Sequence, residues 1–301
     1  MKLRVPRAAV WMALLGALVS CAGIKHRAPV AQSSTPSPVE APRSSPAVSP
    51  DPDSEAVRVA VIGDWGAGSE AQALVAKRMC EKRRATPFDE VITTGDNFYQ
   101  PDGVATLEHF DKPEACLLSA GVRFRAAWGN HDVAGTSTAS RLGSVSHHFT
   151  WTQGKTTFIV LDSNRADDVL QTRWLESTLK ASAGHAKIVV FHHPAFTAGP
   201  HRNDRRVLAN WVGLFEKFNV TLVLSGHNHD YEHSNVNGID YVVTGGGGQT
   251  VYPCVRNESY LIRCLSVHHF LVIESSQRHV DVMAIDAEGQ QIDHFRINLK
   301  A

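Results

Sequence analysis

Short apolar runs alternate with helical patterns along the central part of the chain. Residues 57–62 form a β-branched run that ends at Gly63-Asp64, and residues 69–82, rich in Ala, Lys and Arg, follow with helical character. A strand followed by a helix opens a βαβ unit. The same alternation recurs further on, with apolar runs at 90–94, 122–128, 156–161, 188–191 and 220–224 and helical patterns at 167–181 and 205–218. The pattern predicts an α/β fold.

The last third of the sequence changes pattern. Asn237-Gly238 lies between two extended runs, which is typical of a type I′ hairpin turn, and residues 270–286 indicate two antiparallel strands. We therefore expect mixed sheets, two of them packed together, with helices outside. Residues 57–301 suit one large domain.

The N-terminus is expected to be an export signal. Lys2, Arg4 and Arg7 precede an apolar stretch of twelve residues, 8–19, which is too short for a membrane span of roughly 20 residues but suits a cleavable signal peptide. The segment Leu18-Val19-Ser20-Cys21 resembles the lipobox of bacterial lipoproteins, which implies a signal peptide over 1–21 and acylation of Cys21. An ordinary signal peptide that is cut nearby is the alternative.

Residues 22–56 are expected to form a disordered tether. Seven Pro and six Ser occur among the 26 residues from Ala28 to Asp53, and such a composition cannot offset the entropy cost of folding. With a lipid anchor on Cys21, the chain would be an exported lipoprotein of the bacterial cell envelope, facing the periplasm or the exterior. Ala22, in place of Asp, favours the outer membrane.

The charge balance indicates no nucleic-acid partner. Lys plus Arg and Asp plus Glu both number 30, so the chain has no basic excess of the kind that nucleic acid attracts. An anionic substrate must be held locally. The sequence does not indicate the oligomeric state.

Four cysteines lie beyond the expected signal peptide: Cys80, Cys116, Cys254 and Cys264. An exported protein meets an oxidising compartment, where disulfides form. We expect a bridge between Cys254 and Cys264, because the loop between them is short. Cys80 and Cys116 either pair or remain buried thiols. A zinc site is less favoured, because no Cys-x2-Cys spacing occurs.

Five of the apolar runs end in residues that bind metals or handle protons. The five segments are Gly63-Asp64-Trp65-Gly66, Gly95-Asp96-Asn97-Phe98-Tyr99, Gly129-Asn130-His131-Asp132, Val189-Val190-Phe191-His192 and Gly226-His227-Asn228-His229. Ligands of open α/β sheets bind beyond the carboxyl ends of the strands, so these side chains can converge. Asp96 is our candidate for a carboxylate that bridges two metal ions. His227 and His229, one residue apart, point to the same side of an extended segment. Oxygen ligands mixed with imidazoles suit iron, zinc or manganese.

The five segments resemble the signatures of the purple acid phosphatases, within the calcineurin-like metallophosphoesterases. GDxG, GDxxY, GNH(D/E), VxxH and GHxH occur in that order between Val57 and Gly248. The resemblance implies an αββα sandwich and a dinuclear centre of Fe(III) with a divalent Fe, Zn or Mn ion. The implied ferric ligands are Asp64, Asp96, Tyr99 and His229. The implied ligands of the divalent ion are Asp96, Asn130, His192 and His227.

The resemblance also implies roles for histidines outside the ligand set. His131 would face the phosphate and the leaving group, and His201 would be a second outer-sphere histidine. His193 is the rival of His201, and it is also a rival of His192, because Val190 with His193 satisfies VxxH too. Pro194, two residues after His192, favours His192.

The implied activity is metal-dependent hydrolysis of phosphate esters. A small phosphorylated substrate would be cleaved by a metal-activated hydroxide in an acid phosphatase-like phosphomonoesterase. One alternative is a non-redox dinuclear metallophosphoesterase that acts on phosphodiesters or nucleotides. Another is a surface lipoprotein that keeps the fold but only binds phosphorylated ligands or a partner. Tyr99 separates the ferric branch from its colourless relatives, and its alternative role is to pack against Trp65.

Overall fold

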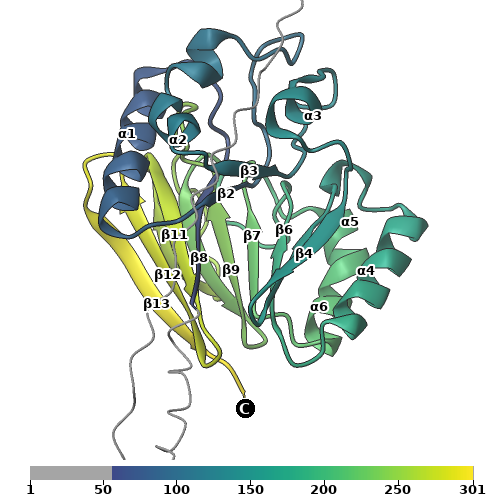
Figure 1. Ribbon diagram of the computed structural model, residues 1–301. Helices are drawn as coiled ribbons and strands as arrows, with labels where there is room; N and C mark the ends of the chain where they lie inside the picture. The colour runs from purple at the N-terminus through teal and green to yellow at the C-terminus, as the bar shows by residue number, and fades with distance from the viewer. Residues whose placement is uncertain (1–55, 301) are drawn as a thin grey trace, which may run out of the picture. The chain divides into compact units, whose positions relative to one another are not determined.

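The computed structural model describes residues 56–300, which form two mixed β-sheets with helices on their outer faces (Figure 1). The strand order is β13-β12-β11-β1-β2-β3 in the six-stranded sheet and β10-β8-β9-β7-β6-β5-β4 in the seven-stranded sheet. The prediction of an α/β sandwich of two mixed sheets is confirmed. The predicted signal peptide 1–21, with Cys21, and the tether 22–56 lie outside the described residues, apart from Ala56. In the described part, no helix has both the length and the apolar character that a membrane crossing requires.

The six-stranded sheet joins the two ends of the domain. Its strands are β1 (Val57–Ile62), β2 (Glu90–Thr93), β3 (Arg123–Ala126), β11 (His269–Ser275), β12 (His279–Asp286) and β13 (Gln291–Asn298). The strands β1, β2 and β3 run parallel, whereas β11 pairs antiparallel with β1. The predicted antiparallel pair within 270–286 is β11 with β12.

The seven-stranded sheet has a parallel centre. Its strands are β4 (Phe149–Gln153), β5 (Thr156–Val160), β6 (Ala186–Val190), β7 (Leu222–Ser225), β8 (Tyr231–Val236), β9 (Ile239–Thr244) and β10 (Leu261–Leu265). The strands β5, β6, β7 and β9 are parallel neighbours. The predicted hairpin joins β8 to β9, and Asn237 and Gly238 have φ of 51° and 81°, as a type I′ turn requires.

Helices cover the outer faces of both sheets. Those of the first half are α1 (Glu70–Ala85), the π-helix η1 (Leu107–Asp111), α2 (Ala115–Ser119) and α3 (Ser137–Leu142). Those on the seven-stranded sheet are the 3-10 turn η2 (Ser163–Arg165), α4 (Val169–Ala181), α5 (Arg205–Val207), the π-helix η3 (Leu208–Val212) and α6 (Gly213–Lys217). The helix predicted over 205–218 is divided into three parts, because its middle turn has the wider π form. Trp211 of this turn is fully buried against Phe191.

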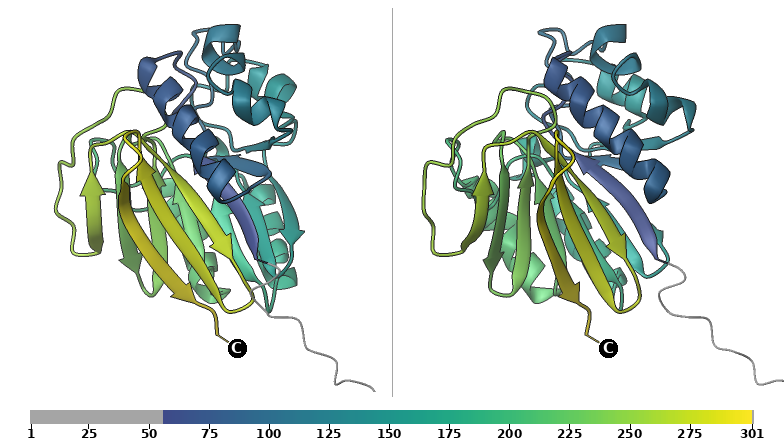
Figure 2. Two further views of the ribbon diagram at one scale, coloured as in Figure 1. Left: turned by 60° about the vertical axis from the view of Figure 1, so that its left-hand side comes forward. Right: turned by 90° about the vertical axis from the view of Figure 1, so that its left-hand side faces the viewer.

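The hydrophobic core lies in layers that follow from the alternation of side chains along a strand. Val59 and Val61 of β1 join a cluster that includes Ile188 and Leu224 of the other sheet. Ile62 points the other way and joins the cluster beneath α1. Figure 2 shows that α1 lies against the six-stranded sheet. This packing fixes the strand ends of both sheets relative to one another.

Two disulfides fasten the surface segments. Cys80 of α1 pairs with Cys116 of α2, with 6.3 Å between their Cα atoms, and Cys254 pairs with Cys264 of β10, with 6.1 Å between theirs. The predicted bridge between Cys254 and Cys264 is confirmed. Of the two alternatives for Cys80 and Cys116, the structure shows the pair.

Candidate metal centre

The seven predicted ligands all follow strand ends, and the structure brings them together. Asp64 follows β1, Asp96 and Tyr99 follow β2, and Asn130 follows β3, so four come from the six-stranded sheet; His192, His227 and His229 follow β6 and β7 of the other sheet. Binding of metal by these residues stays a prediction.

One cluster forms around the Tyr99 hydroxyl. Its oxygen lies 3.1 Å from Asp64 Oδ1, 3.3 Å from Asp96 Oδ2 and 3.1 Å from His229 Nε2. These are the four residues that the resemblance assigns to a ferric site. The alternative role of Tyr99 does not occur, because Trp65 packs instead against Phe98, Phe110 and Phe124.

A second cluster forms around His192. Its Nε2 lies 3.4 Å from Asp96 Oδ1 and 3.1 Å from Asn130 Oδ1, and its ring is 5.0 Å from that of His227. Asp96 therefore contributes Oδ2 to the first cluster and Oδ1 to the second. This is the arrangement expected of a carboxylate that bridges two cations.

Backbone carbonyls determine which ring nitrogen of each histidine faces the clusters. His192 Nδ1 donates to the Thr94 carbonyl over 3.0 Å, and His229 Nδ1 donates to the Thr250 carbonyl over 2.9 Å. In the neutral rings, each Nε2 then presents a lone pair to carboxylate oxygens. A cation between these lone pairs and the carboxylate oxygens would satisfy both, so the donor set fits bound metal ions.

The charges in the two clusters point the same way. The Asp64 and Asp96 side chains are 0% and 2% exposed. Burial opposes the charge of Asp96, but the nearby His192 lowers the pKa of Asp96. Burial alone would lower the pKa of His192, and Asp96 outweighs it and raises that pKa to about 9. The buried Asp96 carboxylate thus attracts positive charge, whereas burial raises the pKa of Asp64.

Two further ligand candidates are neutral in this environment. Burial, followed by the proximity of His192, lowers the pKa of His227 to about 2, so that His227 presents the unprotonated imidazole that binds metals. Burial raises the pKa of Tyr99 well above its ordinary range, and Asp64 and Asp96 add to the effect. Ionisation of Tyr99 therefore requires a strong positive charge beside its oxygen.

Three of the predicted ligands have an unusual backbone conformation. Asp64, Asp96 and His227 have φ of 54°, 48° and 70°, a region that costs L-residues free energy and is typical of functional sites. The expectation that His227 and His229 lie on an extended segment was wrong, because residues 227–230 form a bend, with Asn228 N donating to the Gly226 carbonyl over 2.9 Å. Both rings nevertheless line the same cavity.

Two glycines allow the aspartates to approach the neighbouring loops. A Cβ atom on Gly129 would lie 2.1 Å from Asp96 Oδ1, and one on Gly226 would lie 2.3 Å from Asp64 Oδ2. Side chains at these positions would displace the carboxylates. The first glycine of GNH(D/E) and of GHxH is therefore needed to leave room for the neighbouring carboxylate.

Asp132 joins two of the ligand loops. Its buried carboxylate accepts hydrogen bonds from Gly129 N at 2.7 Å, Asn97 N at 3.0 Å and Thr138 Oγ1 at 2.8 Å. It thereby connects the loop of Asp96 and Tyr99 with the loop of Asn130. Sequence reasoning assigned no role to Asp132, although it closes the GNH(D/E) signature.

A cavity of about 280 Å³ opens beside the clusters, and both predicted outer-sphere histidines line it. Its lining residues are Asp96, Tyr99, Asn130, His131, His201, His227, His229, Gln249, Thr250 and Tyr252. His131 Nε2 lies 3.9 Å from Asp96 Oδ2, and its own backbone N–H donates to Asp96 Oδ1 over 2.8 Å. The His201 ring centre is 4.2 Å from that of His227.

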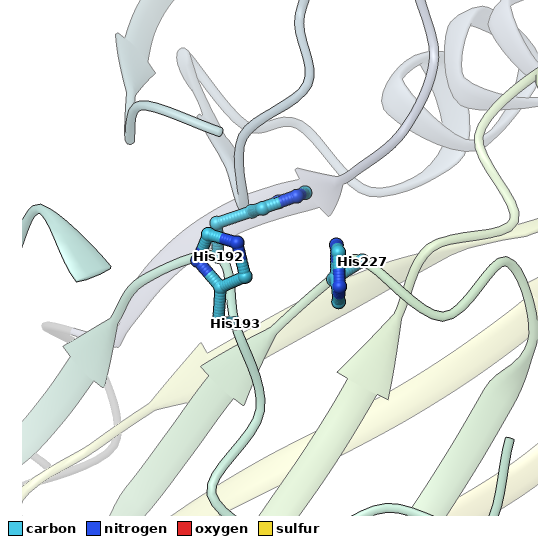
Figure 3. Close-up of side chains that lie close together, drawn as sticks. All are labelled: His192, His193 and His227. Atoms are coloured by element: carbon cyan, nitrogen blue, oxygen red, sulfur yellow. The ribbon is translucent and has the colours of Figure 1, made fainter. Parts of the chain in front are cut away.

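His193 is absent from the lining of this cavity. Its Nδ1 lies 2.8 Å from the Ser163 hydroxyl, and burial lowers its pKa to about 3. Its ring remains close to His192 and His227, as Figure 3 shows, with the three candidate ligand atoms within 4.8 Å of one another. The contacts with Asp96 and Asn130 favour His192 for VxxH, and the cavity favours His201 over His193.

Sequence reasoning missed the segment 249–252 on the cavity wall. The Tyr252 ring lies 4.1 Å from that of His229 at an angle of 14°, and the Thr250 carbonyl holds His229 as described above. The segment carries no recognised motif. Its only sequence signal is the run Gly245–Gly248 that precedes it.

A family model and several curated relatives match this chain. The family model described as calcineurin-like phosphoesterase matches residues 57–231, which contain all seven predicted ligands. Purple acid phosphatase 17 of Arabidopsis thaliana is 26% identical over 289 residues, covering 81% of this chain and 85% of that protein. Tartrate-resistant acid phosphatase type 5 of Homo sapiens is 23% identical over 301 residues, covering 82% and 92%.

Solved structures show the same fold. GAP50, the anchor in the inner membrane complex of Plasmodium, superposes with a TM-score of 0.71 at 21% identity, covering 82% of this chain and 90% of that one. Purple acid phosphatase PPD1 of yellow lupin (Lupinus luteus) superposes with a TM-score of 0.69 at 16% identity, covering 81% and 54%. At these identities, the likeness concerns the fold alone.

Proposed function

The chain belongs to the calcineurin-like phosphoesterase family, as a purple acid phosphatase-like metallophosphoesterase, and from this premise we propose that it hydrolyses small phosphate monoesters with an Fe(III)–M(II) centre. The observation that carries the proposal is the division of the site into two clusters that share Asp96, one of which contains the Tyr99 phenol. A phenol oxygen among two carboxylates and an imidazole suits a trivalent ion.

The residues that would hold the metals follow from the two clusters. Asp64, Tyr99 and His229 would bind the ferric ion, and Asn130, His192 and His227 would bind a divalent Fe, Zn or Mn ion. Asp96 would bridge them. When bound, such a pair supplies charge stabilisation of the phosphate and activates a water molecule for attack. The carbonyls that hold His192 and His229 keep their Nε2 atoms aimed at the site.

The two cavity histidines act on the ester itself. His131 and His201 lie on the cavity wall, where a phosphate group would contact both. A protonated imidazole there binds a phosphate oxygen or gives its proton to the departing alkoxide. A positioned acid of this kind contributes about 10² to 10⁴ in rate.

Replacement of the bridge tests the dinuclear assignment. Asp96→Asn keeps the shape of the side chain but removes its charge, so we expect loss of turnover of an aryl phosphate and loss of bound metal, measured by elemental analysis. Asp167→Asn, at an exposed carboxylate away from the cavity, is the matched control. A folded Asp96→Asn protein with full turnover would show that the dinuclear assignment is wrong. A wild-type protein that binds phosphate without turnover would favour a role in binding alone.

Replacement of the phenol tests the ferric branch. Tyrosinate bound to iron(III) absorbs visible light, so the metal-replete protein should be coloured and Tyr99→Phe should be bleached. Tyr241→Phe, at a buried phenol of another cluster, should keep the colour. The second candidate function is a non-redox phosphoesterase acting on diesters or nucleotides, in which the Tyr99 hydroxyl would stay protonated and donate a hydrogen bond to a carboxylate. A colourless wild-type protein that is active with manganese or zinc would establish it.

We also propose that the enzyme is an exported lipoprotein of the outer membrane, anchored through Cys21. The lipobox-like segment supports this, and the two disulfides fit an oxidising compartment. Cys21→Ser should release the protein from the membrane fraction and abolish incorporation of labelled fatty acid. Retention of the variant in that fraction would contradict the anchor.

A further inference from the structure

Tyr252 occupies a position on the cavity wall that the ligand set leaves unexplained. It lies in the loop between β9 and β10, with its ring stacked on His229, and its ring centre is 5.6 Å from that of His201. Its backbone N–H donates to the His229 carbonyl over 2.7 Å. Within residues 56–300, its hydroxyl makes no hydrogen bond.

The loop that carries Tyr252 is fixed to the rest of the site at several points. Gln249 N donates to the Asp64 carbonyl over 3.0 Å, upstream of Tyr252. Downstream, Val255 N and Arg256 N both donate to the Ala198 carbonyl over 3.0 Å, and the adjacent Cys254 is held by its disulfide to β10. Tyr252 therefore has a defined place relative to the metal ligands and to His201.

A phenol with an unused hydroxyl suits the recognition of an anion. A phenol O–H can donate a hydrogen bond to an anionic oxygen. Tyr252 shares the cavity with Asn130, His131 and His201, so a phosphate held between those side chains lies on the same side as the phenol. Because stacking on His229 already holds the ring in place, ligand binding does not have to order it further, and this favours binding.

We propose that Tyr252 is a substrate-binding residue, and that its hydroxyl donates a hydrogen bond to a non-bridging oxygen of the bound phosphate group. The proposal rests on the proposed function, since it names a residue that holds the substrate of that same site. It places the recognition of the phosphate partly on the loop after β9, outside the five signatures.

The test compares Tyr252→Phe with the wild type in the metal-loaded protein. Inorganic phosphate is the probe, and its dissociation constant is measured by titration calorimetry. A hydrogen bond to a charged group is worth enough to change the affinity about tenfold or more, so we expect about tenfold weaker phosphate binding and a similar loss in kcat/KM. Tyr241→Phe removes a phenol outside the cavity and should change neither value.

A second variant separates the hydroxyl from the ring. Tyr252→Leu removes both, and the ratio of kcat/KM for an aryl and an alkyl phosphate reports on stacking with the leaving group. The proposal predicts that Tyr252→Phe weakens phosphate binding and lowers kcat/KM by the same factor for the aryl and the alkyl phosphate. It is overturned if Tyr252→Phe binds phosphate as the wild type does, including the case in which only Tyr252→Leu is impaired and only with the aryl ester.

The experiment also distinguishes this inference from the proposed function. If the wild type binds phosphate but hydrolyses no ester, the monoesterase assignment fails, and the phosphate affinities of the variants still decide the role of Tyr252. If the wild type hydrolyses esters and Tyr252→Phe keeps its phosphate affinity, only the inference about Tyr252 fails. Equal thermal unfolding of the variants confirms that the fold is intact.

Discussion

Glu114 is a buried carboxyl group that should make the stability of this protein depend on pH. It is 1% exposed and precedes α2. Gln72 Nε2 approaches its Oε1 at 3.5 Å, and within the described residues its Oε2 is buried without a hydrogen bond. Burial raises the pKa of Glu114 from its ordinary 4.5 to about 8, against a small opposing effect of Gln72.

The sign of the effect follows from the two pKa values. Below pH 4.5, Glu114 is protonated in both the folded and the unfolded chain, so its contribution to stability is fully present. Between pH 4.5 and 8 the unfolded chain ionises while the folded one does not, and the free energy of unfolding falls. At about 1.4 kcal/mol per pKa unit, the loss reaches about 5 kcal/mol above pH 8.

Glu114→Gln removes this pH dependence, because an amide does not ionise. The free energy of unfolding of the variant minus that of the wild type should rise by about 1.4 kcal/mol per pH unit between pH 5 and pH 7.5. Urea denaturation at several pH values measures it. The other ionisable groups are common to both proteins and cancel in the difference.

Glu288→Gln, at an exposed position between β12 and β13, is the control. Its free energy of unfolding should change with pH as that of the wild type does. Parallel curves for Glu114→Gln as well would refute the reasoning, since they would mean that Glu114 ionises as readily in the fold as in the unfolded chain. A constant offset at all pH values reports only the packing of the new amide.

Two further substitutions test the supports of the site. Gly129→Ala would place a Cβ atom 2.1 Å from Asp96 Oδ1, so we expect loss of bound metal in elemental analysis, and full metal content would contradict the steric argument. Glu232→Ala removes the acceptor of Thr197 Oγ1, Ala198 N and Gly199 N, at 2.6, 2.6 and 2.9 Å. Gly199 N keeps a second acceptor, Thr197 Oγ1 at 3.2 Å, so two donors are left unpaired. Calorimetry should show a loss of about 2 kcal/mol or more in unfolding free energy, since each unpaired buried donor costs about 1 to 3 kcal/mol. A loss below 1 kcal/mol would mean that water replaces the carboxylate.

The sequence predicted those parts of the fold that depend on local pattern. β-branched runs and the Asn237-Gly238 turn identified strands and a hairpin, because side-chain alternation and positive φ are local requirements. The convergence of Asp64, Asp96 and Asn130 was also predictable, since the parallel strands β1, β2 and β3 place their carboxyl ends at one edge of a sheet.

Other features depend on contacts between distant segments and left no local signal. The bend at His227 is imposed by Asp64, whose Oδ2 accepts the His227 N–H over 3.0 Å, although the two residues are far apart in sequence. Tyr252 reaches the cavity because Val255 and Arg256 bond to the Ala198 carbonyl. Neither arrangement has a periodicity or a motif from which it could be read.

Neither sheet holds a complete set of ligands, and this has a consequence for the order of events during synthesis. Asp64, Asp96, Tyr99 and Asn130 leave the ribosome long before His227 and His229, and β1 finds its antiparallel partner only when β11 has been made. A growing or truncated chain thus has only part of the proposed ligand set. If these residues bind the metals as proposed, metal binding must be among the last steps of maturation, and fragments that end before residue 229 should remain metal-free.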